Sequence, residues 1–523
     1  MIRSIRMTGL YVSVTYGPVF KRNEALLGGY AMEANENKKK KGKVRGFFAA
    51  IGGFFGDFGT AVKKGDIFTK LSLIVMGAGN AARKQWGRAV LITIIQVAVI
   101  LMSVMWAPQY VSKFSTLGTV QKADQKQVFD PVTMKFVTDD SQPYDNSFKI
   151  LLYCIMIFVV WFVFFIIWMK NEISAYKTEQ LAKSGGRVPK IKDDIKSFAN
   201  EKFHITLLSL PVTGIVIFTI VPILLLILVA FTNYDQNHMT PTYLFTWVGF
   251  DNFAALFGSG GLSSSFSYAF VRILGWTLIW AFFATLTNFV FGIMLALLVN
   301  NKRTKIKPFW RTLFVITIAV PQFVSLLLVK NFFADSGIVN TILSNWGFTG
   351  FLKDIGLIST NYIPFLSKPG WAHVMIILIN IWIGIPYTMM VTTGVLLNLP
   401  SDQLESARID GARSGQIFRK ITMPYIMFIM GPTLVTDFVK NINNFNVIYL
   451  LTEGNYNTTN QLMANSQAKE TDLLVTWLFR LTQDYYNYKM ASVIGIMVFL
   501  VCVVFTLIAF NRFIKGDREE TFQ

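Results

Sequence analysis

Polar and aromatic side chains interrupt two apolar stretches of the sequence, one around residue 380 and the other around residue 440. Asn380 and Tyr387 are seven residues apart, about two turns of a helix, so a helix would present both on one face. Asn441 and Asn444 share a face in the same way at a spacing of three. Amides that donate and accept hydrogen bonds beside an aromatic ring suit a sugar. The two stretches therefore favour a sugar path, the alternative being that these groups only hold helices together.

The sequence shows no catalytic or metal-binding motif beside this candidate path. It contains no G-x-x-x-x-G-K-[ST] phosphate loop, no H-E-x-x-H and no C-x-x-C, and its three histidines, His204, His238 and His373, are far apart. No Ser-His-Asp or paired-carboxylate arrangement is recognisable. We therefore predict a protein that is not an enzyme and binds no metal or cofactor directly. Energy for transport would come from an ion gradient or a partner chain.

The composition indicates an integral membrane protein. Hydrophobic residues make up 53% of the 523 residues and charged residues only 15%, against roughly 25% charged in a soluble domain. Two cysteines are too few for a disulfide scaffold. Eight stretches are long and apolar enough to cross a bilayer, which predicts an all-α, polytopic helical bundle. They are roughly Ala89–Ala107, Ile150–Met169, Ile205–Phe231, Leu274–Val299, Thr312–Val329, His373–Leu397, Tyr425–Leu450 and Ala491–Phe510.

The distribution of Lys and Arg supports this number of spans. With the N-terminus in the cytoplasm, the inner segments carry 36 Lys and Arg and the outer segments carry 12. The bias alternates loop by loop, as the positive-inside rule requires. We therefore expect a multi-pass protein of the cell (plasma) membrane with both termini in the cytoplasm. The net charge of +19 then reflects topology and attraction to anionic lipid rather than nucleic-acid binding.

Polar residues inside such spans usually face the bundle interior or a water-filled path. Asp437 and Lys440 lie three residues apart in the seventh span, where they could pair. Prolines are also predicted to interrupt the third, fifth, sixth and seventh spans, as in the broken helices of transporters, although prolines are common in membrane helices generally. These prolines are Pro211, Pro222, Pro321, Pro386 and Pro432.

The N-terminal region is predicted to lie on the cytoplasmic side. Residues 1–31 show no secretory signal, and we expect Met32 to be the true start. An aromatic stripe within Gly46–Val62 predicts a helix lying in the membrane interface, the alternative being a helix packed on another element. Its members recur every three to four residues: Phe47, Phe48, Ile51, Phe54, Phe55 and Phe58.

The connection between the sixth and seventh spans, residues 399–424, is predicted to form two short helices with a break. Pro400 ends the preceding span and Ser401 is a good N-cap. The pair Asp410-Gly411 breaks the chain, and Pro424 would stop the second helix. A compact knob of mixed charge is suited to docking rather than to chemistry, although an ordinary loop would have a similar composition.

The same connection resembles the EAA loop of ABC-importer permeases. The match departs only at Ser406 and comprises eight positions in order: Glu405, Ala407, Asp410, Gly411, Ala412, Phe418, Ile421 and Pro424. The resemblance implies an ABC type I importer permease fold (MetI-like). It also implies that the loop inserts into a groove of a separate ATP-binding subunit, with Glu405 contacting a basic residue there. ATP and Mg would then be used by that partner chain.

The flanking spans resemble maltose/maltodextrin permease subunits of the MalF type, over about residues 205–515. The matching runs are Asn380-Ile-Trp382-Ile-Gly384-Ile-Pro386-Tyr387, Phe438-Val-Lys440-Asn441-Ile-Asn443-Asn444-Phe445 and Leu450-Leu-Thr452-x-Gly454. The resemblance implies sugar contacts at Asn380, Ile383, Gly384, Tyr387, Asp437, Lys440, Asn441 and Asn444. The family often has Ser or another small residue in place of Asp437 and an aromatic in place of Lys440, so the exact sugar stays open.

The connection between the third and fourth spans, about Thr232–Arg272, is too short for the large periplasmic domain of Gram-negative members, which points to the Gram-positive-like form. The resemblance implies four kinds of partner besides the bilayer: a second permease subunit (MalG-like), two ATP-binding subunits (MalK-like), an extracellular sugar-binding lipoprotein and the oligosaccharide. We expect a cytoplasmic N-terminal region (1–88), two accessory spans (89–203), a permease core (204–515, with the EAA loop at 400–424) and a cytoplasmic tail (516–523).

Two alternatives stay open at this point. An ion-coupled secondary sugar transporter would need carboxylates within the membrane, and Asp437 is the only good candidate inside the predicted spans. An ABC permease for a different oligosaccharide would keep the architecture and change only the sugar.

Overall fold

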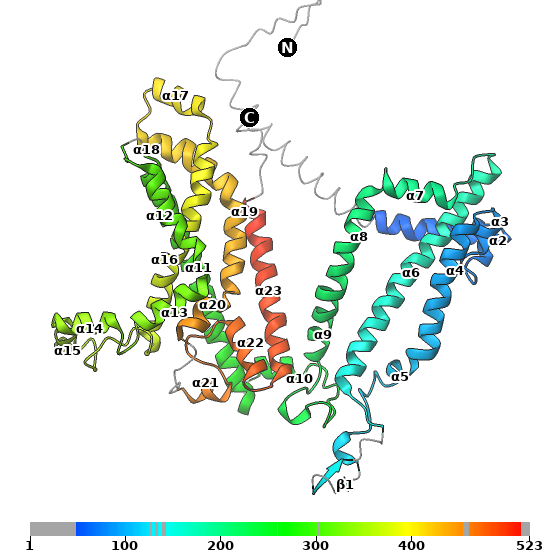
Figure 1. The fold of residues 1–523 in the computed structure, drawn as a ribbon, viewed down its shortest axis with the longest axis horizontal. Coiled ribbons are helices and arrows are strands. Elements are labelled where there is room, and N and C mark those ends of the chain that lie inside the picture. The colour runs from blue at the N-terminus through cyan, green and yellow to red at the C-terminus, as the bar shows by residue number, and fades with distance from the viewer. Residues whose placement is uncertain are drawn as a thin grey trace, which may run out of the picture. The chain divides into compact units, whose positions relative to one another are not determined.

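The computed structural model describes residues 49–125, 127–130, 134–138, 143–258, 260–301, 303–452 and 460–513 (Figure 1). The predictions for residues 1–31, Met32, Phe47, Phe48, Gly454 and 516–523 lie outside these ranges. Two compact units divide the chain. The first, called unit 1 here, comprises Met1–Pro108 and Met156–Gly214, and unit 2 comprises Gln109–Ile155 and Ile215–Gln523.

Seven helices in the described residues are long and apolar enough to cross a membrane. They are Trp86–Trp106, Ser147–Lys183, Phe203–Val229, Ser264–Asn300, Pro369–Leu397, Ser414–Thr452 and Tyr488–Asn511. An eighth candidate is the pair α12 (Lys307–Ala319) and α13 (Gln322–Phe332), which meet at 91°. The prediction of about eight membrane helices is thus confirmed. The fifth span, predicted over Thr312–Val329, is not one helix, because the backbone is extended at Val320 and a second helix begins after Pro321.

Three π-helical turns each end two residues before a proline. Met102–Trp106 precedes Pro108, Val216–Ile220 precedes Pro222, and Phe418–Thr422 precedes Pro424. A proline ring clashes with the carbonyl four residues earlier, and in all three cases that carbonyl lies inside the wider π turn. The prediction that Pro424 stops a helix is therefore wrong, since the chain stays helical from Ser414 to Ile442. Other prolines predicted to interrupt spans lie inside continuous helices, namely Pro211, Pro386 and Pro432.

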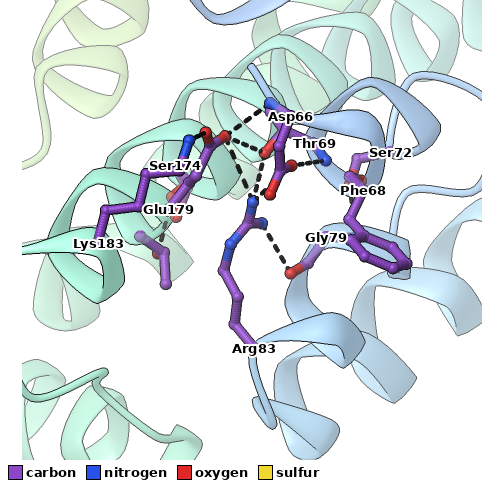
Figure 2. A network of polar contacts seen from close by, with 10 residues as sticks. Asp66, Phe68, Thr69, Ser72, Gly79, Arg83, Ser174, Glu179 and Lys183 are labelled. Atoms are coloured by element: carbon purple, nitrogen blue, oxygen red, sulfur yellow. Dashed lines mark hydrogen bonds and ion pairs between the residues drawn. The ribbon is translucent and has the colours of Figure 1, made fainter. Parts of the chain in front are cut away.

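Unit 1 is held together by a buried polar network around Arg83, which follows α3 (Figure 2). The guanidinium of Arg83 lies 2.9 Å from the Asp66 carboxylate and 3.4 Å from that of Glu179, and it also donates to Thr69 Oγ1 and to the Gly79 carbonyl. Glu179 accepts further hydrogen bonds from Asp66 N–H, Thr69 Oγ1 and Lys183 Nζ. Burial opposes the effect, but the Thr69 N–H and Arg83 hold the pKa of Asp66 below its usual value. Each carboxylate in Figure 2 is thus matched by donors.

The elements of unit 1 are short helices set around two long ones. They are a helix over residues 49–64, α2 (Ile67–Leu71), α3 (Ala78–Ala82), α4 (Trp86–Leu101), the second part of α6 (Ser147–Lys183), α7 (Ile191–Ala199) and α8 (Phe203–Ile215, in unit 1 up to Gly214). In the helix over residues 49–64, Phe58 packs on Trp168 with ring centroids 5.2 Å apart, whereas Ile51 and Phe55 are exposed. Phe58 of the aromatic stripe therefore packs on α6, and the position of the stripe at a membrane interface stays a prediction.

In unit 2, α11 (Gly261–Asn300) is the central helix, in contact with α16 (Pro369–Leu397) and α19 (Met423–Ile442). One buried cluster, centred on Trp280 and Ile376, joins α11, α13, α16 and α20 (Phe445–Thr452); a second, centred on Phe289 and Met430, joins α11, α16 and α19. A third cluster joins α11 to α10 (Asp251–Phe257), α22 (Leu474–Gln483) and α23 (Tyr488–Phe513). The first two clusters border the site described below.

The remaining elements of unit 2 are short. The helices are α5 (Pro108–Val111), α9 (Val221–Val229), α14 (Ile338–Asn345), α15 (Phe348–Asp354), α17 (Ser401–Ile409), α18 (Ser414–Ile417) and α21 (Gln461–Asn465), with 3-10 turns at Lys122–Asp124 and Gln236–His238. Strands β1 (Gln127–Asp130) and β2 (Lys135–Thr138) form an antiparallel hairpin with Val128 opposite Val137. This hairpin is the one departure from the all-α prediction among the described residues.

Candidate substrate path and docking loop

All eight residues that the sequence assigns to a substrate path line one cavity of about 640 Å³ in unit 2. This volume falls within the range of roughly 300–1,000 Å³ that is typical of small-molecule sites. One group comes from α16, namely Asn380, Ile383, Gly384 and Tyr387, and the other from α19 and the residues after it, namely Asp437, Lys440, Asn441 and Asn444. The structure therefore brings the two stretches together, while sugar contact by these side chains stays a prediction.

The cavity lies where two helices are broken. One wall is the bend between α12 and α13, with Pro321, and another is the gap between α19 and α20, at Asn443 and Asn444. Irregular backbone at membrane depth leaves N–H and C=O groups without helical partners, and it is tolerated where it lines a cavity or is buried in protein. Both breaks face the same space, which favours a polar path there.

A short hydrogen-bond chain fixes the amides at the end of α19. Asn441 Nδ2 donates to Thr285 Oγ1 on α11 at 3.0 Å, and Asn444 Nδ2 lies 3.5 Å from Asn441 Oδ1. The backbone carbonyl of Asn441 also accepts from Trp280 Nε1 at 3.0 Å. The Asn441 amide is thus oriented by α11, whereas the amide of Asn444, which lies after α19, is oriented by Asn441 and by the Val447 N–H that donates to its Oδ1.

Two other amides at the cavity keep unused hydrogen-bonding atoms. Asn288 Oδ1 and Asn380 Nδ2 are buried and have no partner among the described residues. Gly384, one turn after Asn380 on α16, faces Asn288 so closely that an added Cβ would lie 2.1 Å from Asn288 Nδ2. Gly384 therefore makes room for Asn288. One unpaired acceptor and one unpaired donor then line the same cavity.

Several lining residues were missed from the sequence, the most informative being Asn288, Gln322 and Ser325. Asn288 follows Thr285 by three residues within a mostly apolar stretch of α11, which is the same spacing signal that singled out Asn441 and Asn444. Gln322 and Ser325 repeat it directly after Pro321. Other polar or aromatic side chains at the wall are Thr317, Trp382, Thr388, Asn443, Phe445 and Asn446.

The two charged residues at the cavity behave differently from expectation. Asp437 and Lys440 are three residues apart on α19, but no ion pair or hydrogen bond joins them to each other or to another described residue. Asp437 is half-buried and Lys440 is exposed. The possible pairing of these residues is therefore not found, and both charges face the cavity unmatched by contact.

The predicted docking loop forms a helix, a tight turn and a second helix, as expected. Helix α17 ends in a Schellman motif: the Gly411 N–H donates to the Arg408 carbonyl, and the Ala412 N–H donates to the Ala407 carbonyl. Gly411 has φ +77°, the left-handed conformation that glycine adopts without strain. Asp410-Gly411 thus breaks the helix as predicted.

One detail of the loop was wrong: Ser401 is the first residue of α17 and not its cap, a position that Pro400 occupies without a side-chain hydrogen bond. Glu405, Asp410 and Gly411 are exposed, and Ile409 is 85% exposed. A single exposed apolar side chain does not by itself mark an interface, so docking by this loop stays a prediction. The other matched residues, Ala407, Ala412, Phe418, Ile421 and Pro424, are half-buried.

The loop and the cavity share two helices. The loop, with α17 and α18, lies at the same end of unit 2 as the start of α12 and the end of α23, and opposite α21 and α22 (Figure 1). It directly continues α16, which carries Asn380 and Tyr387, and leads into α19, which carries Asp437 and Asn441. A rigid-body movement of the loop would therefore be passed to both walls of the cavity.

Comparison with known proteins identifies the family. Residues 288–515 match the family described as binding-protein-dependent transport system inner membrane component. The maltodextrin transport system permease protein MdxF of Bacillus subtilis is 30% identical over 450 residues, which are 86% of this chain and 95% of MdxF. The galactooligosaccharides transport system permease protein GanP of the same organism is 32% identical over 388 residues, or 74% of this chain and 87% of GanP.

Two further matches complete the comparison. MalF of Klebsiella aerogenes, a maltose/maltodextrin transport system permease protein, is 31% identical over 51% of this chain and 49% of MalF. A crystal structure of a bacterial ABC transporter involved in the import of alginate contains a chain that is 24% identical to this one. The match includes 62% of this chain and 98% of the transporter chain, and the two superpose with a TM-score of 0.46. The near-complete match to MdxF carries the assignment. This chain belongs to the family of ABC-importer permease subunits that includes the maltose and maltodextrin permeases, and it is a multi-pass membrane transport subunit rather than an enzyme.

Proposed function

We propose that this subunit passes a maltodextrin-like oligosaccharide through the cavity of about 640 Å³. The observation that carries the proposal is that all eight sequence-predicted path residues, from two helices, line this single cavity. Its unpaired atoms, Asn288 Oδ1 and Asn380 Nδ2, suit a hydroxyl group, which both donates and accepts a hydrogen bond. Tyr387 and Trp382 add aromatic faces for pyranose rings.

Transport would proceed by alternating access, driven by ATP and Mg on partner chains. We infer that the loop around Glu405 docks on the ATP-binding subunit, because it matches the EAA pattern at eight positions, Glu405 is exposed, and the loop joins α16 to α19. A second permease subunit (MalG-like), two ATP-binding subunits (MalK-like) and an extracellular sugar-binding lipoprotein would complete the importer. No cofactor would be bound by this chain itself.

The orientation follows from charge. With 36 Lys and Arg on the side of the loop and of both termini against 12 on the other, the loop and both ends would lie in the cytoplasm of a plasma-membrane protein. A cysteine introduced at Ser414, which is exposed, should resist membrane-impermeant maleimide in intact cells and react after lysis. Labelling in intact cells would contradict this orientation.

A different neutral oligosaccharide is the second candidate, favoured by the 32% identity to GanP. Membership of an ABC-importer family argues against the ion-coupled alternative. Both sugars can be tested together on the complex assembled with its partner subunits and binding protein, by measuring ATPase activity with maltotriose, longer maltodextrins and galactooligosaccharides. Stimulation by maltodextrins alone supports the first candidate, and stimulation by galactooligosaccharides alone supports the second.

A matched pair of variants tests the coupling step. Glu405→Lys should abolish sugar-stimulated ATPase activity while leaving sugar binding intact, because the residue lies on the docking surface and not at the cavity. Asp402→Lys makes the same charge change on the same exposed helix, at a position outside the eight matched residues, and should retain stimulation. Equal loss in both variants would contradict a specific role for Glu405.

A further inference from the structure

The cavity is lined by one acidic and one basic side chain that do not form an ion pair with each other. Of the described residues that line it, Asp437 is the only acidic one and Lys440 is the only basic one. Neither contacts an oppositely charged described residue. The wall of the cavity therefore carries no net charge, and both charged groups stay available to a ligand.

This arrangement is unusual in an apolar bundle. A carboxylate and an ammonium at a spacing of three on one helix can pair directly, and in a membrane unpaired charges are costly and mark functional positions. Asp472 and Arg480, two buried charged residues that also belong to unit 2, do pair, at 3.1 Å. Because Asp437 and Lys440 are not paired, a bound ligand could form hydrogen bonds with both side chains.

We propose that Asp437 and Lys440 keep the path electrically neutral and thereby select uncharged oligosaccharides over acidic or basic ones. This inference rests on the proposed sugar path and adds the substrate class that the path accepts. Sugar hydroxyls donate to the Asp437 carboxylate and accept from the Lys440 ammonium, so a neutral sugar satisfies both without adding charge.

A charged sugar would upset this balance. The carboxylate of an acidic sugar near Lys440 also lies near Asp437, because the two residues are less than one helical turn apart. Repulsion between the carboxylates is strong where water is scarce. An amino sugar meets the same difficulty at Lys440. The selection would therefore depend on the net charge of the wall and not on either side chain alone.

Four proteins separate these possibilities: the unchanged chain, Asp437→Asn, Lys440→Gln and the double variant. Each is assembled with its partner subunits, without the binding protein, and sugar binding is measured by equilibrium dialysis in detergent. The probes are neutral maltotriose and galactotriose, acidic trigalacturonate and a basic glucosamine trimer. Asp402→Asn, which changes the charge equally but outside the cavity, serves as the control, and size-exclusion chromatography checks the assembly of every variant.

The unchanged chain should bind a neutral trimer at least about tenfold more tightly than either charged trimer, a difference of about 1.4 kcal/mol. Asp437→Asn should gain affinity for trigalacturonate by about tenfold, and Lys440→Gln should gain it for the glucosamine trimer. The double variant and Asp402→Asn should gain neither. Equal binding of all trimers by the unchanged chain, no gain in either single variant, or a gain in the double variant would overturn the inference.

The proposed function can fail separately. If no neutral trimer binds to the unchanged chain while the single variants still gain their charged trimers, the sugar assignment is wrong, and the gains show only that Asp437 and Lys440 repel ligands of their own charge at the cavity. If neutral trimers bind and the single variants show no gain, the charge selection alone is overturned.

Discussion

Two sets of buried polar groups in this chain differ in whether their hydrogen bonds are complete. In unit 1, Arg83 joins Asp66 and Glu179, and each carboxylate accepts at least two hydrogen bonds from protein donors. At the cavity of unit 2, Asn288 Oδ1 and Asn380 Nδ2 have no partner among the described residues. Arg83, Glu179 and Asn380 are all less than 10% exposed, so the difference is not one of burial.

The difference indicates what each set is for. A buried polar network whose bonds are all made stabilises one structure, whereas a buried group left unpaired costs free energy until a ligand completes it. Arg83 is therefore expected to matter for stability, and Asn380 for binding. The comparison would be wrong if a variant at Arg83 changed sugar binding but not stability, or if a variant at Asn380 changed stability but not binding.

The largest effect is expected from Arg83→Met. The change leaves Glu179, with a side chain 2% exposed, and Asp66 without their shared cation, which should destabilise unit 1 by about 3 kcal/mol. Thermal unfolding in detergent should show a clearly lower midpoint. Lys177→Met removes an exposed ion pair with Asp57 at 3.3 Å and should change stability by only about 0.5 kcal/mol or less. Similar midpoints for the two variants would show that the network is not a structural unit.

Gly384→Ala should have the next largest effect. Its new Cβ would lie 2.1 Å from Asn288 Nδ2, and overpacking of this kind costs about 1–3 kcal/mol. Both thermal stability and sugar binding should fall, because Asn288 must leave its position at the cavity. Asn288→Ala in the same chain should restore stability but not binding. Failure of the double variant to recover stability would mean that Gly384 meets another obstacle.

The helical architecture could be predicted because its signals are local. Runs of about twenty apolar residues mark seven long helices among the described residues. The bend at Pro321 could not be told from the continuous helices at Pro386 and Pro432. Each contains a proline in an apolar run, and the packing around it decides whether the helix bends.

The site was predictable where two residues share a helix face and unpredictable where contacts are distant in sequence. Asn441 and Asn444 follow from spacing, but the bond from Asn441 to Thr285 spans 156 positions. The same holds for unit 1, where Asp66 and Glu179 are 113 positions apart. Gly384 resembles a sugar-contact position in sequence, and only the structure reveals that it makes room for Asn288.

Asn380→Leu should separate binding from stability. Replacing a buried amide whose Nδ2 is unpaired should leave the free energy of unfolding unchanged or raise it by up to about 1 kcal/mol, while sugar affinity falls roughly tenfold. Thr392→Val, on the same helix but outside the cavity, should leave affinity unchanged. Binding by equilibrium dialysis and thermal unfolding should be measured on the same samples. A large loss of stability in Asn380→Leu would show that Asn380 has a structural role, like Arg83, and not mainly a binding role.

The smallest effect is expected at Glu172 in α6, which with Gln85 is an exception among the described residues of unit 1. Its side chain is 1% exposed, and both carboxylate oxygens lack a hydrogen-bond partner among the described residues. Glu172→Met keeps the shape and removes the unpaired carboxylate, so the unfolding midpoint should rise, by about 1 kcal/mol in free energy. Glu201→Met, at an exposed position, should have no effect. A loss of stability instead would mean that Glu172 is held in place by the charge of Arg83 or by bound water. In that case, whether buried polar groups have all their direct hydrogen bonds would no longer distinguish the stabilising network of unit 1 from the cavity of unit 2.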